Sequence, residues 1–252
     1  MKIDYKDHYN DDYFTGGKKY RTPDGKEHAY HGPALTWGGF SFVADGLAKL
    51  LPHSEGKNTL LDIGCSGGDL CRRLKDHGFD PWGVDISEFA IRNAVPEMRN
   101  RVAVVDISET PERIFTTFPN SPLSCEFPSQ FDVLIATDLL EHIYYEDLDR
   151  VFDWMVAKTK TWMFFCVAIT ESRAGEFVHK KGEPVPIEME TTAVSGHVNV
   201  RTFGWWVKFF RSKGLIIDFE RMYTFQMRRE LIPEWKGTGG WNMGTTFFLK
   251  KR

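Results

Sequence analysis

The sequence predicts an α/β protein whose sheet is doubly wound, mostly parallel, and carries one antiparallel strand near the C-terminus. Three observations favour this fold class. From Asn58 onward, short apolar runs alternate with segments whose apolar residues recur at helical spacing. The apolar runs are continuous, which is typical of parallel strands that helices cover on both faces. The chain then closes with two β-rich stretches, 215–225 and 244–252, joined by a loop rather than by a clear helix.

The individual helices and strands are predicted from the spacing of their apolar residues and from glycines at helix ends. In the predicted helix at 68–78, Leu70, Cys71 and Leu74 share one face. Gly78 and Gly214 are typical of helix C-termini. In chain order we expect a strand at 59–64, a helix at 68–78, a strand at 81–87, a helix starting at Ser87, a strand at 101–108, a strand running into a turn at 131–143, a helix at 145–158, a strand at 161–169 and a helix at 203–214.

Two regions fall outside this alternation. Residues 1–57 precede the first strand, with an irregular loop expected at 15–33 and a helix at 40–51. Residues 170–202 form a long connection after the strand at 161–169. Connections of that length in a compact domain usually carry function or are disordered.

Composition excludes several classes of protein. The 252 residues include 42% hydrophobic and 14% aromatic residues, enough to fill a core, and the net charge is −3. Without a long basic run, we expect no nucleic-acid partner. The chain has four cysteines, none in a CxxC pair, and no apolar segment long enough for a signal peptide or a membrane helix. We therefore expect a cytoplasmic protein with reduced thiols and no membrane association.

The stretch LLDIGCSGGDL (60–70) turns from a predicted strand through glycines into a predicted helix. A phosphate-binding P-loop needs a lysine after the last glycine, but Asp69 stands there. The spacing G-x-S-G-G is also too compact for the dinucleotide fingerprint, which disfavours a nicotinamide reductase. A tight turn without any ligand remains an alternative on the loop alone.

Aspartates stand at or near the ends of four successive predicted strands: Asp62, Asp85, Asp106 and Asp138. In a doubly wound sheet these ends meet at the edge where ligands bind. An aspartate after a strand is more commonly a helix N-cap. Four aspartates at corresponding positions of successive strands nevertheless favour a ligand site. Asp85 is placed to accept hydrogen bonds from both hydroxyls of a ribose.

With these motifs the chain resembles the class I S-adenosylmethionine-dependent methyltransferases. The resemblance rests on LLDIGCSGG, GVDIS, VVDIS and FDVLIATDLLEHI, and covers roughly residues 58–170. Ser66 replaces the middle glycine of the family's D-x-G-x-G-x-G motif. The resemblance implies a Rossmann-like, seven-stranded sheet and S-adenosyl-L-methionine as cofactor. It also implies a methyltransferase domain at 58–252, preceded by an N-terminal lid and helix at 1–57, with the insertion at 170–202 forming the acceptor pocket.

The resemblance also assigns residues to the cofactor. It implies that the loop 64–68 lies against the methionine part, that Asp85 holds the ribose, and that Asp106 with Ile107 frames the adenine. The cofactor-binding residues expected in this way are Asp62, Gly64, Cys65, Ser66, Gly68, Asp85, Ile86, Asp106, Ile107, Asp138 and Leu139.

Two histidines are candidates for catalysis. His197 precedes the helix at 203–214, in the position where the family often carries a histidine loop over the acceptor, and His142 follows the strand at 131–143. Histidine is the natural general base near neutral pH. Asp138, Glu141 and His142 resemble metal ligands, but metal-dependent members of the family gather carboxylates or amides from different strands, so we expect no metal.

The predicted function is methyl transfer to a small molecule, with O-methylation favoured over N-methylation. An RNA or protein methyltransferase is the first alternative, and a non-catalytic methyltransferase-like binding protein is the second. Four aromatic residues of the N-terminal segment are candidates for stacking on the ligands or for anchoring a lid: Tyr9, Tyr13, Phe14 and Tyr20. The sequence does not indicate the oligomeric state.

Overall fold

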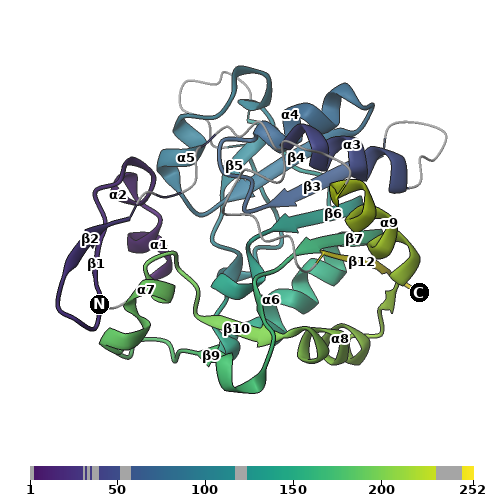
Figure 1. Cartoon of the computed structure of the whole chain (residues 1–252). Coiled ribbons are helices and arrows are strands. Elements are labelled where there is room, and N and C mark those ends of the chain that lie inside the picture. Colours follow the sequence, from purple (N-terminus) through teal and green to yellow (C-terminus); the bar gives the residue numbers. More distant parts are fainter. Residues whose placement is uncertain are drawn as a thin grey trace.

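A central sheet of seven strands in the order β11-β12-β7-β6-β3-β4-β5 organises the protein (Figure 1). The computed structural model describes residues 3–30, 32, 35, 40–51, 58–116, 124–230 and 246–252. The strands of the sheet are β3 (Thr59–Ile63), β4 (Asp80–Asp85), β5 (Val102–Val104), β6 (Phe131–Thr137), β7 (Thr159–Cys166), β11 (Ile216–Ile217) and β12 (Thr246–Lys250).

The pairing confirms the predicted fold class. Strand β3 pairs in parallel with β4 and β6, which in turn pair in parallel with β5 and β7. Strand β12 runs antiparallel to both of its neighbours, β7 and β11. The sheet is therefore parallel except for one strand near the C-terminus, as the sequence predicts.

Helices cover both faces of the sheet. The larger ones are α3 (Phe40–Leu50), α4 (Asp69–Asp76), α5 (Glu88–Arg92), α6 (Tyr145–Lys158), α8 (Phe203–Ser212) and α9 (Phe219–Glu230). Helices α3 and α9 lie on one side, and α6 and α8 on the other (Figure 1). No helix within the described ranges is both long and apolar enough to cross a membrane.

Adjacent phenylalanines on β7 show why the strands read as continuous apolar runs. Successive side chains of a strand point to opposite faces. Phe164 packs on Phe225 of α9, with ring centroids 5.4 Å apart, whereas Phe165 stacks on Phe210 of α8 at 5.7 Å. Because both faces are covered, both positions of the alternation are apolar and fully buried.

The prediction of a β-rich stretch at 215–225 is wrong for most of its length. Only Ile216–Ile217 form a strand, and α9 follows at once. Asp218 begins the helix because its side chain accepts a hydrogen bond from the backbone N–H of Arg221 at 2.9 Å. Met222 and Phe225 then bury one helical face against the core, so tertiary packing overrides the β-propensity of the segment. The expected loop between the last two strands falls on 231–245, outside the described residues.

The predicted irregular loop at 15–33 contains a hairpin instead. Strands β1 (Lys19–Arg21) and β2 (Glu27–Ala29) pair antiparallel across a turn in which the N–H of Gly25 donates to the carbonyl of Thr22. Gly25 has φ +83°, which explains the glycine at this position. The strand predicted at 101–108 is also shorter than expected, because Asp106 caps a 3-10 turn at Ile107–Glu109.

Residues 3–30 of the N-terminal region and the insertion 170–202 lie side by side at the carboxyl ends of the sheet strands (Figure 1). They are joined by a hydrogen bond of 2.9 Å from the backbone N–H of Arg21 to the Glu190 carboxylate. The first contains α1 (Tyr5–His8), α2 (Asp11–Thr15) and the hairpin; the second contains β8 (Ile169–Thr170), β9 (Phe177–Val178), α7 (Glu190–Ala193) and β10 (Asn199–Thr202). Strands β8, β10 and β9 form a small sheet of their own.

Candidate active site

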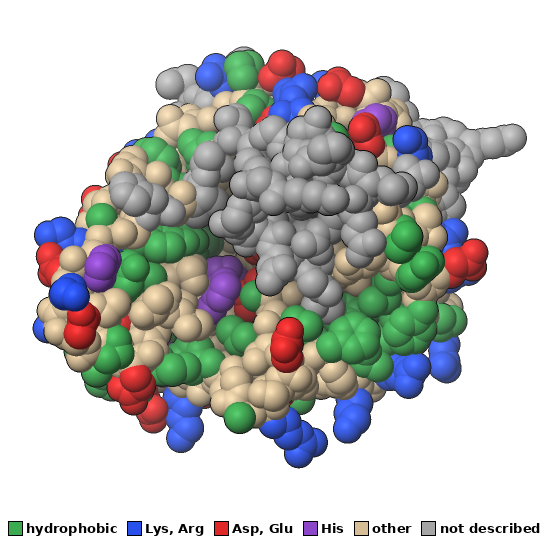
Figure 2. Space-filling view, viewed as in Figure 1, with side chains coloured by type: hydrophobic (Ala, Val, Ile, Leu, Met, Phe, Trp, Pro, Cys, Tyr) green, Lys and Arg blue, Asp and Glu red, His purple; other side chains and the backbone are tan. Residues whose placement is uncertain are grey.

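A cavity of about 1070 Å³ opens at the carboxyl ends of β3, β4, β5 and β6, beneath the N-terminal segment. That volume includes space open to solvent at the mouth of the cavity. Figure 2 shows the hollow in this face, with histidine side chains inside it and apolar side chains around it. Its described lining is Tyr5, Tyr9, Tyr13, Phe14, Phe40, Ile63, Gly64, Ser66, Val84, Asp85, Ile86, Val105, Asp106, Ile107, Ser108, Thr137, Asp138, Leu139, His142 and Ile143.

The glycine loop forms one wall of the cavity. The backbone N–H groups of Gly64 and Cys65 both donate to the carbonyl of Val84, which ties the loop to β4. Gly64 has φ +77°, and Ser66 follows with φ +50°, so the chain turns sharply before α4. The Ser66 hydroxyl is buried and has no hydrogen-bond partner among the described residues. The loop therefore presents an unused polar group at the cavity.

Asp85 is the last residue of β4 and points into the cavity. Its two carboxylate oxygens accept the backbone N–H groups of Ser66 and Ser87, each at 2.8 Å. Burial raises the pKa of Asp85, and these hydrogen bonds act in the opposite direction. Each carboxylate oxygen has a second acceptor site, so the side chain is oriented and still able to accept hydrogen bonds from a ligand.

Asp106 lines the cavity and also caps the 3-10 turn after β5. One of its carboxylate oxygens accepts both the N–H of Ser108 at 2.9 Å and the Ser108 hydroxyl at 2.6 Å. The other lies 4.0 Å from the exposed ammonium group of Lys6 in α1. Asp106 can therefore cap the 3-10 turn and still face a ligand in the cavity.

The expectation of four carboxylates at one edge holds for three of them. Asp62 does not line the cavity, because it precedes the end of β3 by one residue and alternation directs it to a face of the sheet. There the thiol of Cys71 donates to it at 3.5 Å, and burial raises the pKa of Asp62 to about 7. Cys65 and Gly68 also lie outside the lining, with the Cys65 sulfur facing Gly83.

The N-terminal segment closes the cavity through tyrosines. The Tyr9 hydroxyl lies 2.8 Å from Nδ1 of His142, and the Tyr13 hydroxyl donates to the carbonyl of Ser195 at 3.1 Å. The Tyr5 hydroxyl accepts the N–H of Tyr144 at 2.6 Å. This segment thus contacts both the loop after β6 and the insertion. Tyr20 stacks on His28 within the hairpin, away from the lining.

The structure brings the two candidate histidines together. The rings of His142 and His197 meet edge to face with centroids 4.8 Å apart. Burial lowers the pKa of His197 to about 4 and holds that of His142 well below its usual value. Both imidazoles are therefore neutral at pH 7. His142 lines the cavity, whereas His197 lies behind it at the insertion.

Two carboxyl groups follow β6 close to His142 in the chain: Asp138, which is half-buried and lines the cavity, and Glu141. Asp138 follows β6 with φ +50°, and burial raises its pKa. Glu141 is fully buried, and burial together with the neighbouring charge of Asp138 raises its pKa. Within the described part of the chain, one group of side chains is arranged so that it can hold a metal ion: Glu141, His142 and His197.

Sequence reasoning missed several lining residues. The strand-end residues Ile63, Val84, Val105 and Thr137 line the cavity, as do Phe40 and Ile143. All of these except Thr137 are apolar, which is the same signal that marks the core, so the sequence does not separate them from it. Ser108 was also missed, although its position beside Asp106 is a signal.

The sequence model of a family described as a methyltransferase domain matches residues 38–215. The chain belongs to this family. It is a class I methyltransferase, for which the cofactor is S-adenosylmethionine. The Ser66 hydroxyl without a partner and the oriented carboxylate of Asp85 fit a polar nucleoside in the cavity.

Curated relatives match a limited part of the chain. It is 30% identical over 84 residues to the ubiquinone biosynthesis O-methyltransferase of Pseudomonas entomophila, a match that covers 33% of each protein. The corresponding enzyme of Paraburkholderia phymatum is 29% identical over 115 residues, or 45% of each protein. The chain thus spans between a third and a half of the length of these relatives.

Solved structures support the fold alone. A SAM-dependent methyltransferase from Archaeoglobus fulgidus has a TM-score of 0.51 at 15% identity and covers 84% of this chain and 94% of its own. The Haemonchus contortus phospholethanolamine N-methyltransferase 2, in complex with phosphomonomethylethanolamine and S-adenosylhomocysteine, has a TM-score of 0.51 at 16% identity. It covers 88% of this chain and 55% of its own.

Proposed function

We propose that this methyltransferase transfers a methyl group from S-adenosylmethionine to a hydroxyl group of a small molecule. The observation that carries the proposal is the pair of neutral imidazoles, His142 and His197, at the closed aromatic end of the cavity. A hydroxyl acceptor benefits from a base that takes its proton, and a neutral imidazole is able to do so. The curated O-methyltransferase relatives agree with this choice.

The cofactor residues follow from the edge of the sheet. Asp85 accepts hydrogen bonds from the ribose hydroxyls, Ser66 lies against the methionine part, and Asp106 and Ile107 frame the adenine. When bound, the cofactor supplies an activated methyl group on a sulfonium, whose departure as a thioether needs no acid. This chain's residues therefore have to position the two reactants and exclude water.

The acceptor residues come from the N-terminal lid and the insertion. Tyr9 fixes the ring of His142 through its hydrogen bond to Nδ1, and the edge-to-face contact places His197 beside it. His142 lines the cavity and takes the proton from the acceptor hydroxyl as the general base. The aromatic side chains of Tyr5, Tyr13 and Phe14 exclude water from the reacting groups.

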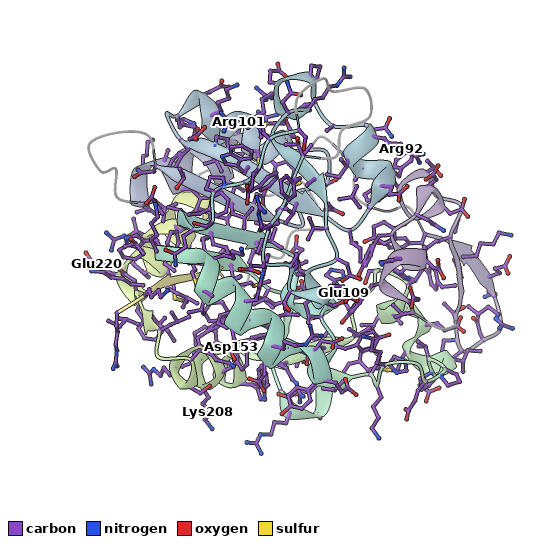
Figure 3. The ribbon with its side chains drawn as sticks, turned by 180° about the vertical axis from the view of Figure 1, so that it is seen from behind. Arg92, Arg101, Glu109, Asp153, Lys208 and Glu220 are labelled. Carbon is purple, nitrogen blue, oxygen red and sulfur yellow. The ribbon has the colours of Figure 1, made fainter. Side chains whose placement is uncertain are left out.

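The lining of the cavity favours a small acceptor over a nucleic acid. Figure 3 labels Arg92, Arg101 and Lys208, which lie far apart in this view. A nucleic-acid enzyme needs basic groups gathered along one face. The described lining of the cavity also contains no lysine or arginine.

A methyl-acceptor screen tests the proposal. The full chain is incubated with S-adenosylmethionine and matched pairs of small acceptors, phenols and catechols against the corresponding anilines, and the products are identified by mass spectrometry. We expect O-methylated products from the hydroxyl series, and none when the Asp85→Ala variant is used. Methylation of the amine series alone would overturn the choice of acceptor.

A further inference from the structure

Three side chains from two distant segments converge behind the cavity. Glu141 and His142 belong to the 3-10 turn Leu140–His142 that follows β6, and His197 belongs to the insertion just before β10. One carboxylate oxygen and one ring nitrogen from each histidine lie within 4.8 Å of one another. The backbone N–H of Val198 donates to the carbonyl of Glu141 at 2.9 Å, which holds the insertion at this place.

Glu141 supplies an independent sign of a missing ligand. Its Oε1 accepts the backbone N–H of Ala168 at 2.8 Å, but Oε2 has no hydrogen-bond partner among the described residues. The side chain is 0% exposed. A buried carboxylate oxygen without a partner is unfavourable, and such atoms in native structures usually bind a water or an ion.

Glu141 and His142 are each oriented by a hydrogen bond at one of their two polar side-chain atoms. The Tyr9 hydroxyl lies at Nδ1 of His142, and the backbone N–H of Ala168 donates to Oε1 of Glu141, which leaves Oε2 without a partner among the described residues. Hydrogen bonds of this kind from outside the ligand set are typical of metal sites, because they fix ring and carboxylate orientation.

We propose that Glu141, His142 and His197 bind a divalent transition-metal cation at the acceptor end of the cavity. Two imidazoles and one carboxylate match the preferences of Zn²⁺, Co²⁺, Mn²⁺ and Fe²⁺ and not those of Mg²⁺ or Ca²⁺, which prefer oxygen ligands. Zinc bonds of about 2.0–2.1 Å keep tetrahedral ligands roughly 3.4 Å apart. The three atoms therefore approach one another on binding, which rotation of the half-buried His197 can supply.

Because His142 lines the cavity, a cation held by these three side chains would be within reach of an acceptor there. This role rests on the proposed function. With a cation bound, the acceptor oxygen would bind it and pass its proton to water, and the imidazoles would then serve as ligands in place of the proposed base. The oxygen then forms its bond to the methyl carbon while the carbon–sulfur bonding pair leaves on sulfur.

Metal binding to the full chain tests the site directly. The protein is treated with a chelator, dialysed, and titrated with Co²⁺ and Zn²⁺, with Mg²⁺ as the comparison. Stoichiometry is measured by mass spectrometry of the metal, and coordination by the visible absorption of cobalt. We expect one Co²⁺ or Zn²⁺ per chain and no saturable binding of Mg²⁺.

Matched variants locate the cation. His197→Gln and Glu141→Gln should each weaken Co²⁺ binding by at least about 100-fold, and Tyr9→Phe by roughly tenfold, the effect typical of an outer hydrogen bond. His77→Gln is the control, because His77 is a surface histidine paired with Asp45. Melting temperature and S-adenosylhomocysteine affinity, compared with the unsubstituted protein, identify any variant that fails to fold.

Two results would overturn the site. One is a protein that binds neither Co²⁺ nor Zn²⁺, and the other is binding that His197→Gln leaves unchanged. Failure of the proposed function is distinguishable from both. A protein that binds one cation but methylates no hydroxyl retains the site, whereas full O-methylation by chelated protein removes the cation's role and retains the function.

Discussion

The proposed cofactor half and the proposed acceptor half of the cavity are built in different ways. The cofactor half consists of short segments that each follow one strand of the sheet, such as Asp85 at the end of β4 and Asp106 after β5. The acceptor half is assembled from contacts between segments far apart in the chain. Tyr9 meets His142 across 133 positions, and Tyr13 meets Ser195 across 182.

This difference has a consequence for robustness. The strand ends are rigidly held by a buried parallel sheet, so each cofactor residue depends mainly on its own strand. The acceptor half depends on an N-terminal segment and an insertion that hold one another through a few hydrogen bonds. We therefore expect substitutions in the acceptor half to change turnover, and those in the cofactor half to change cofactor affinity.

The largest expected effect lies in the acceptor half. His197→Ala should lower kcat by roughly 10²–10⁴, because the proposed cation loses a ligand and the ring of His142 loses the side chain that it packs against. The affinity for S-adenosylhomocysteine should stay nearly unchanged, since His197 does not line the cavity. Steady-state kinetics and calorimetry on the same protein check this, with His77→Ala as control. Full turnover in a stable variant would refute the assignment.

The corresponding change in the cofactor half is Asp85→Ala. It removes the carboxylate that the ribose hydroxyls would bind, and the expected loss is about 2–4 kcal/mol of S-adenosylhomocysteine binding. Calorimetry measures it, and Asp76→Ala on the exposed side of α4 is the matched control. Equal affinities in Asp85→Ala and the unsubstituted protein would contradict the role of β4.

A third substitution, Asp62→Asn, tests a buried carboxyl group that affects stability and does not line the cavity. Burial raises the pKa of Asp62 from 3.8 to about 7, so the folded protein holds this proton more tightly than the unfolded chain does. The stability present below pH 4 is therefore lost as the pH rises toward 7. Asp62→Asn removes that loss, and Cys71 can still donate to the amide oxygen.

We expect the free energy of unfolding of Asp62→Asn, relative to the unsubstituted protein, to rise by roughly 2–3 kcal/mol between pH 5 and pH 8. Chemical denaturation of the cofactor-free protein at both pH values measures this difference, and Asp76→Asn is the control. Parallel pH dependence of the two proteins would show that Asp62 titrates normally.

The smallest expected effect concerns the contact between the lid and the insertion. Gly196 has φ +92°, and a Cβ there would meet the Tyr9 hydroxyl and lie 2.8 Å from Nδ1 of His142. Gly196→Ala should lower turnover about tenfold and stability by about 1–2 kcal/mol, without changing cofactor affinity. Gly182→Ala is a close control, because Gly182 has φ +83° but nothing within 4 Å of its Cβ position. If both variants behave alike, backbone strain alone explains the result.

The sequence by itself determined the fold class and most of the cofactor half. Helix α6 was predicted with the bounds Tyr145–Lys158 that the structure has. Three of the four aspartates reach the cavity. These features are local, because the spacing of apolar residues and the position of a strand end depend only on neighbours in the chain.

Only the tertiary structure decided the rest. Alternation along β3 turns Asp62 away from the cavity, and the burial of Met222 and Phe225 makes a helix of a segment with β-forming residues. Above all, the meeting of His197 with Glu141 and His142 depends on where the insertion packs. Contacts over such separations are set by the packing of whole elements, and no local pattern of residues encodes them.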